Sequence, residues 1–261
     1  MDESVARRFS RSALTYAQGV TLHETVADAL LAGLVWPAAE EAGNILDAGC
    51  GTGVLTERLR RAYPMARLTA IDAAPGMVRQ TANRMDGDPA FWGLVEDVRR
   101  LATPMPFDLV ASSSALHWMT PLDRSLARLA QCTRPGGRLY AAVMIEGTLG
   151  ELHVTRRHLF PVMAPSERLA DAREVKLALA AGGWELEQTF ERSFFPCYAS
   201  AVEFFRVIHA QGLTGGKVSH GRRLLTRGEI ARLTAAYGRA YRDAAGGVYA
   251  TYRVLFFSAR R

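Results

Sequence analysis

The chain has 261 residues, of which 49% are hydrophobic and 22% are charged. This composition excludes a disordered chain, and the length suits one large domain with a sizeable core. Because no apolar run of about 18 residues and no hydrophobic leader is present, we expect no membrane span and a cytoplasmic location. Almost all of the basic residues are arginines, and the net charge of +6 favours an anionic partner.

Helical and strand patterns alternate from residue 4 to residue 145. The spacing of apolar residues predicts helices over 4–16, 22–34, 54–62, 75–85 and 122–131. Short apolar runs predict strands at 45–46, 68–71, 91–95, 107–111 and 139–145, with a turn at 134–137 before the last of them. Such alternation is typical of a doubly wound parallel sheet.

The second half of the sequence is less regular. We expect helices over 151–160, 167–181, 201–211 and 227–241, and strands over 185–195 and 249–258 that close the sheet as an antiparallel pair. The predicted fold class is therefore α/β, a doubly wound, mostly parallel seven-stranded sheet with a helical cap. We interpret residues 1–261 as a single domain, with lid helices in 1–36 and a cap insertion in 199–243.

The strongest local signal is the segment Asp47-Ala48-Gly49-Cys50-Gly51-Thr52-Gly53, which follows a strand and opens a helix. Glycines there allow positive φ angles and a close approach of the backbone to a ligand. Asp72 ends the next strand about 20 residues on, where a carboxylate can accept hydrogen bonds from ribose hydroxyls. A dinucleotide fingerprint needs a third glycine at position 54, and Val54 stands there instead.

The DxGxGxG pattern resembles the first motif of class I S-adenosylmethionine (SAM) methyltransferases. This resemblance implies a Rossmann-like fold and SAM as the cofactor. In that family the leading acid organises the methionine end of SAM, Asp72 holds the ribose diol, and Met77 packs on adenine. Either Asp97 or its neighbour Glu96 takes the place of the acid that reads the adenine amino group. The implied cofactor residues are Asp47, Gly49, Cys50, Gly51, Gly53, Asp72, Ala73, Met77, Asp97, Val98 and Ser113.

Further segments narrow the resemblance. Residues 9–16 match the pattern FxRxAxxY, and 112–118, 147–153 and 251–256 also have counterparts in the malonyl-acyl-carrier-protein O-methyltransferase family. The chain resembles that family over nearly its whole length. The resemblance implies SAM-dependent methylation of the free carboxylate of a malonyl thioester, a reaction that primes pimeloyl and biotin synthesis. The implied partner is an acyl-carrier protein carrying malonyl-phosphopantetheine, or malonyl-coenzyme A.

The same resemblance suggests roles for residues outside the cofactor motifs. Tyr16 and His117 are expected to position the acceptor at the lid and mouth of the site, and Arg11 to hold an anion. Arg222 and Arg223 are candidates for docking the acidic carrier protein. A malonyl carboxylate is already ionised at pH 7, so the reaction needs no general base. The three cysteines are too far apart for a disulfide framework or a CxxC metal site, and we expect no metal.

Three other functions compete with this interpretation. A small-molecule carboxylate methyltransferase or a quinone methyltransferase would need no carrier protein. A nucleic-acid methyltransferase would suit the positive charge, but residues 112–115 read Ser-Ser-Ser-Ala where base-amino methylating enzymes carry an Asn/Asp-Pro-Pro-Tyr/Phe motif. A SAM-binding protein without catalysis is the remaining alternative. We expect neither a nucleic-acid nor a membrane partner.

Overall fold

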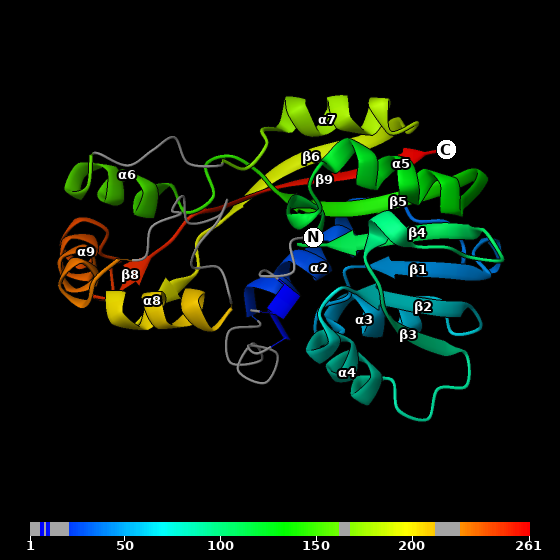
Figure 1. Cartoon of the computed structure of the whole chain (residues 1–261), viewed down its shortest axis with the longest axis horizontal. Helices are drawn as coiled ribbons and strands as arrows, with labels where there is room; N and C mark the ends of the chain where they lie inside the picture. Colours follow the sequence, from blue (N-terminus) through cyan, green and yellow to red (C-terminus); the bar gives the residue numbers. More distant parts are fainter. Residues whose placement is uncertain (1–5, 8, 11–20, 162–167, 212–224) are drawn as a thin grey trace.

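One seven-stranded sheet organises the structure (Figure 1). The computed structural model describes residues 6–7, 9–10, 21–161, 168–211 and 225–261. Its main strands are β1 (Asn44–Ala48), β2 (Arg67–Asp72), β3 (Phe91–Val95), β4 (Phe107–Ser113), β5 (Thr133–Met144), β6 (Glu185–Phe194) and β9 (Tyr252–Arg260). They lie in the order β3-β2-β1-β4-β5-β9-β6, and only β9 runs antiparallel to its neighbours β5 and β6. The predicted doubly wound, mostly parallel seven-stranded sheet is confirmed.

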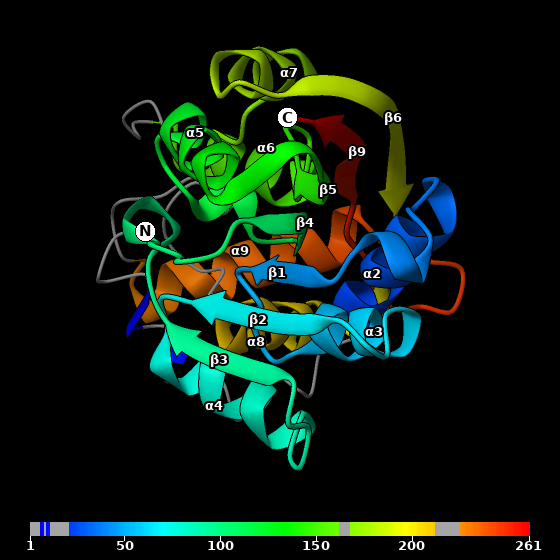
Figure 2. The ribbon, with the colours of Figure 1, turned by 90° about the vertical axis from the view of Figure 1, so that its right-hand side faces the viewer.

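Helices cover both faces of the sheet (Figure 2). They are α2 (Thr21–Gly33), α3 (Val54–Ala62), α4 (Pro75–Arg84), α5 (Leu122–Cys132) and α7 (Ala172–Ala181). Successive side chains of a strand point to opposite faces, so β1 contributes Ile45 to one core and Leu46 to the other. Ile45 packs in the core with Leu30 of α2 and Leu59 of α3. Leu46 shares the second core with Leu126 of α5 and with residues of α7.

The order of the strands decides where a ligand can bind. From β1 the chain moves outward through β2 to β3, and from β4 it moves the other way to β5. The loops that follow β1 and β4 therefore leave in opposite directions, which opens a crevice between the carboxyl ends of these two strands. The glycine-rich segment 49–53 begins directly after β1 and ends directly before α3, with Gly53 as the N-cap of that helix.

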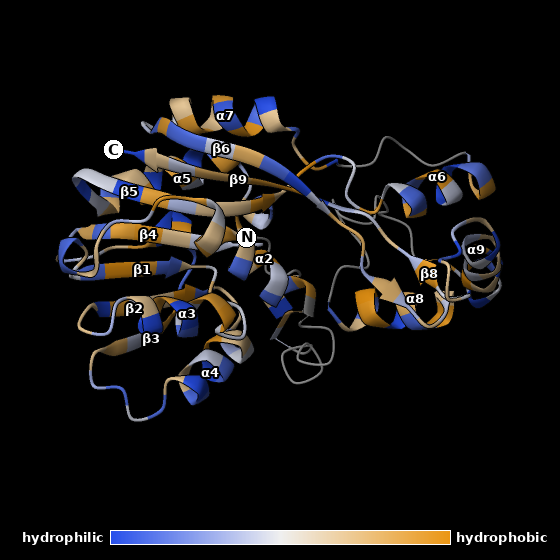
Figure 3. Ribbon diagram, turned by 180° about the vertical axis from the view of Figure 1, so that it is seen from behind, coloured by the Kyte–Doolittle hydropathy of each residue, from blue (hydrophilic) through white to orange (hydrophobic). Residues whose placement is uncertain are grey.

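A second group of helices lies beyond the end of the main sheet (Figures 1 and 3). It contains α6 (Gly150–Leu159), α8 (Ala201–Ala210), α9 (Arg227–Ala240) and a small sheet of β7 (Cys197–Tyr198) with β8 (Val248–Tyr249). Phe204 and Tyr237 stack with ring centroids 4.8 Å apart, and the Tyr237 hydroxyl donates to the Tyr249 carbonyl at 2.8 Å. The proposed cap 199–243 contains α8 and α9, and α6 also packs against α9.

Three predicted elements differ from the observed ones. The turn expected at 134–137 lies inside β5, where the pairing with β4 shifts register and Gly136 has a φ of 76°. The strand expected over 249–258 is divided, because β8 pairs with β7 and β9 joins the main sheet. α7 begins at Ala172, where Asp171 and Glu174 form a capping box that ends the preceding loop. Most of the helix predicted over 4–16 lies outside the described residues.

Candidate active site

A concave feature lies at the crevice between β1 and β4. It is a cavity of about 880 Å³ that opens to solvent. Most of the predicted cofactor residues line it: Gly49, Cys50, Gly51, Asp72, Ala73, Met77, Asp97, Val98 and Ser113. Asp47 and Gly53 are not in the wall but lie directly behind it, at the end of β1 and at the start of α3. The fold thus gathers residues that are up to 66 positions apart, from Asp47 to Ser113, at one edge of the sheet.

The glycine loop leaves space for a ligand. Gly49, Gly51 and Gly53 all have positive φ angles, of 80°, 55° and 86°. A Cβ atom added at Gly51 would meet no atom within 4 Å, whereas one at Gly49 would lie 2.4 Å from the Ala115 Cβ. The loop is held in place because the Gly49 and Cys50 amides donate to the Ile71 carbonyl at 2.8 and 2.9 Å. Gly51 therefore presents bare backbone to the cavity.

Asp47 is a fully buried carboxylate beneath this loop. Its Oδ2 accepts a hydrogen bond of 2.6 Å from the Thr56 hydroxyl, while Oδ1 has no hydrogen-bond partner among the described residues. Burial, reinforced by the nearby Asp72 charge and opposed by Thr56, raises the pKa of Asp47 to about 7. A buried acceptor without a partner is costly, and this one lies behind the cavity wall and not in it.

Asp72 joins the glycine loop to the wall of the cavity. The Gly51 amide donates to Asp72 Oδ2 at 3.1 Å, and the Ala74 amide donates to Oδ1 at 2.8 Å. Burial raises the pKa of Asp72, although these two amides oppose the rise. Each carboxylate oxygen accepts a second hydrogen bond readily, so both can still bind the neighbouring hydroxyls of a ribose. The carboxylate is already oriented for this role.

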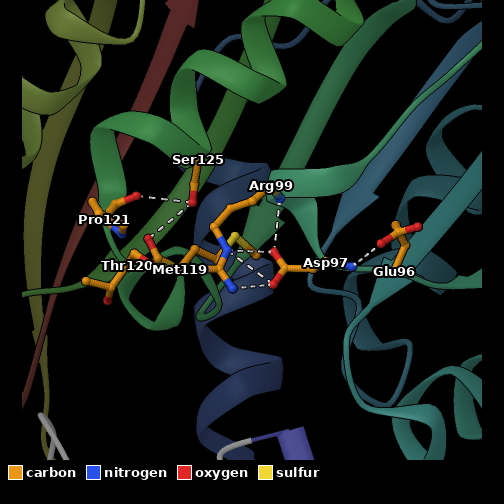
Figure 4. A network of polar contacts seen from close by, with 7 residues as sticks. All are labelled: Glu96, Asp97, Arg99, Met119, Thr120, Pro121 and Ser125. Carbon is orange, nitrogen blue, oxygen red and sulfur yellow. Dashed lines mark hydrogen bonds and ion pairs between the residues drawn. The ribbon is translucent and has the colours of Figure 1, made fainter. Parts of the chain in front are cut away.

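Another part of the cavity wall holds two neighbouring acids, which the sequence leaves as alternatives for the contact with the adenine amino group (Figure 4). Glu96 and Asp97 both line the cavity. Arg99 binds Asp97 through its guanidinium, with a shortest distance of 2.6 Å, and its amide donates to Asp97 Oδ1 at 3.0 Å. Burial would raise the pKa of Asp97, but the bonds from Arg99 contribute to a net shift below its ordinary value. Met77 and Val98 are buried nearby and supply apolar surface for a flat ring.

The remaining wall comes from the N-terminal residues and from the segment after β4. Phe9 and Trp118 meet edge to face with ring centroids 5.3 Å apart, and both line the cavity. His117 is buried beside Trp118, with ring centroids 5.2 Å apart, and is not among the described lining residues. Tyr16, Arg11, Arg222 and Arg223 lie outside the residues that the structure describes.

Among the lining residues to which the sequence assigned no individual role, His23 of α2 and Ser114 after β4 are polar residues outside the glycine loop. His23 occurs in a segment whose only local signal is a helical pattern of apolar residues, so nothing near it in the sequence indicates a site. Ser114 belongs to a run of three serines at the end of a strand, and it lies just outside that strand with a positive φ angle.

The residues present fit SAM. The open space at Gly51 and the free acceptor capacity of Asp72 are matched by the hydroxyl donors of that cofactor. A model of the methyltransferase domain family matches residues 45–137. Malonyl-[acyl-carrier protein] O-methyltransferase of Halorhodospira halophila is 32% identical over 97% of this chain and 85% of its own length. That of Anoxybacillus flavithermus is 31% identical over 81% of each chain.

This chain belongs to the malonyl-[acyl-carrier protein] O-methyltransferase family. It is a SAM-dependent O-methyltransferase, as its methyltransferase domain and these relatives show. The N-methyltransferase NodS of Bradyrhizobium japonicum, solved with S-adenosyl-L-homocysteine, has a TM-score of 0.52 and 14% identity, over 96% of this chain and 98% of NodS. At that identity the similarity shows a shared fold.

Within the described ranges, no helix is both long and apolar enough to cross a membrane.

Proposed function

We propose that this family member methylates the free carboxylate of a malonyl thioester carried by an acyl-carrier protein. SAM, when bound, supplies an electrophilic methyl group on a positively charged sulfur. The names of the relatives support the choice of acceptor. The observation that carries the proposal is the conjunction of a complete cofactor wall, around Asp72 and Gly51, with an aromatic wall of Phe9 and Trp118 in one cavity.

The reaction requires the protein mainly to position the acceptor carboxylate and the methyl donor. A malonyl carboxylate is ionised at pH 7 and can attack a methyl group without losing a proton first. The negative acceptor and the positive sulfonium lose their charges as the bond forms, so exclusion of water favours the reaction. Phe9, Trp118 and Met119 provide apolar surface that keeps water from the reacting atoms. Holding the two partners in line supplies most of the remaining acceleration.

The carrier protein must reach this cavity from outside. We propose that the lid residues 1–36 and the cap residues 199–243 surround the acyl arm, with Tyr16 and His117 positioning the acceptor and Arg11 holding an anion. Arg222 and Arg223 are proposed to dock the acidic carrier. Malonyl-coenzyme A carries the same acyl group and arm, so it is the natural alternative acceptor. The ester product would lack the acyl carboxylate charge and would enter biotin synthesis as an apolar chain end.

The test is a methyl-transfer assay with labelled SAM. Malonyl-carrier protein, malonyl-coenzyme A, free malonate and tRNA are offered separately, and the product is treated with mild base. We expect a base-labile methyl ester on malonyl-carrier protein and a slower reaction with malonyl-coenzyme A. Preferential labelling of free malonate would show a small-molecule enzyme. A base-stable product, or labelled tRNA, would contradict the proposal.

A further inference from the structure

Arg99 connects two sides of the cavity from behind its wall (Figure 4). Its Nη2 atom donates to Asp97 Oδ2 at 2.6 Å, and its Nη1 atom donates to the Thr120 carbonyl at 3.3 Å. Asp97 lines the cavity after β3, whereas Thr120 directly follows Trp118 and Met119, which line it after β4. Arg99 is not among the described lining residues. One guanidinium therefore ties the cofactor side of the cavity to its aromatic side.

The planar fork of Arg99 suits this double contact. Nε lies 3.1 Å from Asp97 Oδ1 while Nη2 binds Oδ2, so one edge of the fork holds the carboxylate and Nη1 remains for the Thr120 carbonyl. The side chains are 39% and 19% exposed for Arg99 and Asp97, so solvent screens the pair only in part. A lysine ammonium is a single point charge without this fork, and it could not maintain both contacts.

The segment that Arg99 holds packs against the glycine loop. A Cβ atom added at Gly49 would lie 2.4 Å from the Ala115 Cβ and 3.0 Å from the Met119 Cε. The Trp118 amide donates to the Ala115 carbonyl at 3.0 Å, and the Met119 amide donates to the Leu116 carbonyl at 2.9 Å, which makes residues 115–119 one compact turn. A displacement of this turn would therefore change the space between the glycine loop and the aromatic wall.

Ser125 of α5 also contacts this segment. Its hydroxyl lies 3.3 Å from the Met119 carbonyl oxygen and 3.2 Å from the Pro121 carbonyl oxygen. A hydroxyl has one proton to donate, so it bonds only one of these carbonyls at a time. Donors from two different elements thus hold the segment, and the one from Arg99 is the contact that reaches the cofactor side.

We propose that Arg99 is a positioning residue for methyl transfer. Asp97 anchors the guanidinium, and through Thr120 the guanidinium fixes Trp118 and Met119 relative to the cofactor side, so that a bound acceptor faces the methyl group in line. The proposal rests on the proposed function for the identity of the acceptor. It requires no contact between Arg99 and either ligand.

The effect of Arg99 should appear in kcat. A displacement of about 1 Å between reacting groups can lower a rate about 100-fold. Loss of the Arg99 contact leaves the segment held by Ser125 and by its own backbone, so we expect a smaller fall in kcat, of about tenfold. Cofactor binding should change little as long as a positive charge remains beside Asp97.

The first experiment is the substitution Arg99→Lys, which retains that charge but lacks the second arm for Thr120. We expect kcat with malonyl-carrier protein to fall about tenfold and the KM for the acceptor to stay within about twofold. The affinity for S-adenosyl-L-homocysteine in calorimetry should stay unchanged. An unchanged kcat would overturn the proposal. So would a loss of cofactor affinity as large as the loss of kcat, because Arg99 would then act on the cofactor through Asp97 alone.

Arg168→Lys is the matched control. The Arg168 guanidinium also joins a carboxylate to a backbone carbonyl, since it lies 2.6 Å from Glu174 Oε1 and donates to the Leu169 carbonyl at 3.2 Å. Arg168 is not among the described lining residues of the cavity. We expect this variant to retain the kcat of the wild type, and an equal fall in both variants would overturn a specific role of Arg99.

The second experiment observes Trp118 by NMR in the intact chain with S-adenosyl-L-homocysteine bound. The indole N–H signal of Trp118 is identified by its loss in Trp118→Phe. Arg99→Lys should shift this signal, because the ring moves relative to its neighbours, and should leave the signals of Trp36 and Trp184 in place. The control variant should shift none of them. An unchanged Trp118 signal would overturn the proposal.

Two of these measurements need no acceptor. The cofactor affinity and the Trp118 signal test the positioning role even if the wild-type chain methylates no malonyl thioester. That failure would refute the proposed function instead.

Discussion

The Gly51 amide donates to the Asp72 carboxylate across 3.1 Å, and this bond joins the two halves of the cofactor motif. Gly51 lies in the loop after β1, and Asp72 is the last residue of β2. The pair keeps the bare backbone of the loop and the carboxylate that we propose binds the ribose in one fixed arrangement. Because a hydrogen bond within the chain already fixes the carboxylate, we expect the site to need little reorganisation to bind the adenosyl group.

Replacing Asp72 by alanine should weaken cofactor binding. The change removes the acceptor for the ribose hydroxyls and also leaves the Gly51 amide without its partner. We expect the affinity for S-adenosyl-L-homocysteine to fall by about 1–3 kcal/mol, measured by calorimetry. Asp72→Asn retains one acceptor oxygen and should lose less. Equal affinity of Asp72→Ala and the wild type would exclude Asp72 from the ribose site.

Alanine at Gly51 should impair cofactor binding, whereas alanine at Gly49 should impair the stability of the fold. A methyl group at Gly51 projects into open space, so Gly51→Ala should cost the fold only the strain of its positive φ, about 1–2 kcal/mol, yet obstruct the cofactor. At Gly49 the new Cβ meets the Ala115 Cβ, so Gly49→Ala should unfold at a clearly lower temperature. Thermal unfolding and cofactor binding of both variants test this contrast. Reversed behaviour would show that the loop does not face the ligand as described.

Asp47 should make the stability of the ligand-free protein depend on pH. Its pKa is about 7 in the folded state and near the ordinary carboxyl value after unfolding, so the folded state binds the proton more tightly. The free energy of unfolding should therefore fall as the pH rises from about 4 to about 7. Asp47→Asn retains an acceptor for Thr56 and removes the titration. The difference in unfolding temperature, wild type minus variant, should decrease over this window, and parallel curves would contradict the assignment.

Reversing the charge of Arg222 and Arg223 tests the docking proposal. Electrostatic docking mainly raises the association rate and weakens as salt screens it, with a Debye length of about 10 Å at 0.1 M. Arg222→Glu with Arg223→Glu should raise the KM for malonyl-carrier protein and change kcat much less. Malonyl-coenzyme A, which has no protein surface, should be affected less. Reversing Arg239 and Arg242, at the end of α9, is the control for a general effect of charge.

Equal losses with both malonyl thioesters would point to damage of the fold or of the acyl site. Activity that does not change with either thioester would place the docking surface elsewhere in the chain. The salt dependence provides an independent check, because the wild type should lose its advantage over the double variant as the ionic strength rises.

Local chemistry is sufficient to predict the cofactor half of the site. The acid and the alternating glycines at 47–53 need only their own order along the chain to indicate a strand, a tight loop and a helix. Asp72 follows from the same logic, because it ends the next strand of a parallel sheet. The periodicity of the sequence also predicts the two antiparallel strands that close the sheet, but it does not predict where they begin and end. β8 pairs with β7 instead of continuing into β9, because pairing between distant strands sets such boundaries.

The rest of the cavity wall depends on packing between distant segments. His23 enters the cavity because α2 packs through Leu30 on the same core as Ile45 and Leu59, and no residue near His23 carries that information. Ser114 lies just after β4 with a φ of 55°, whereas Ser112 and Ser113 belong to the strand and the Ser112 hydroxyl donates to the Ala48 carbonyl. Short-range patterns record the conformation of a loop or a strand. Which side chains meet across a cavity is set by the burial of apolar surface far along the chain, and that becomes visible only in the folded structure.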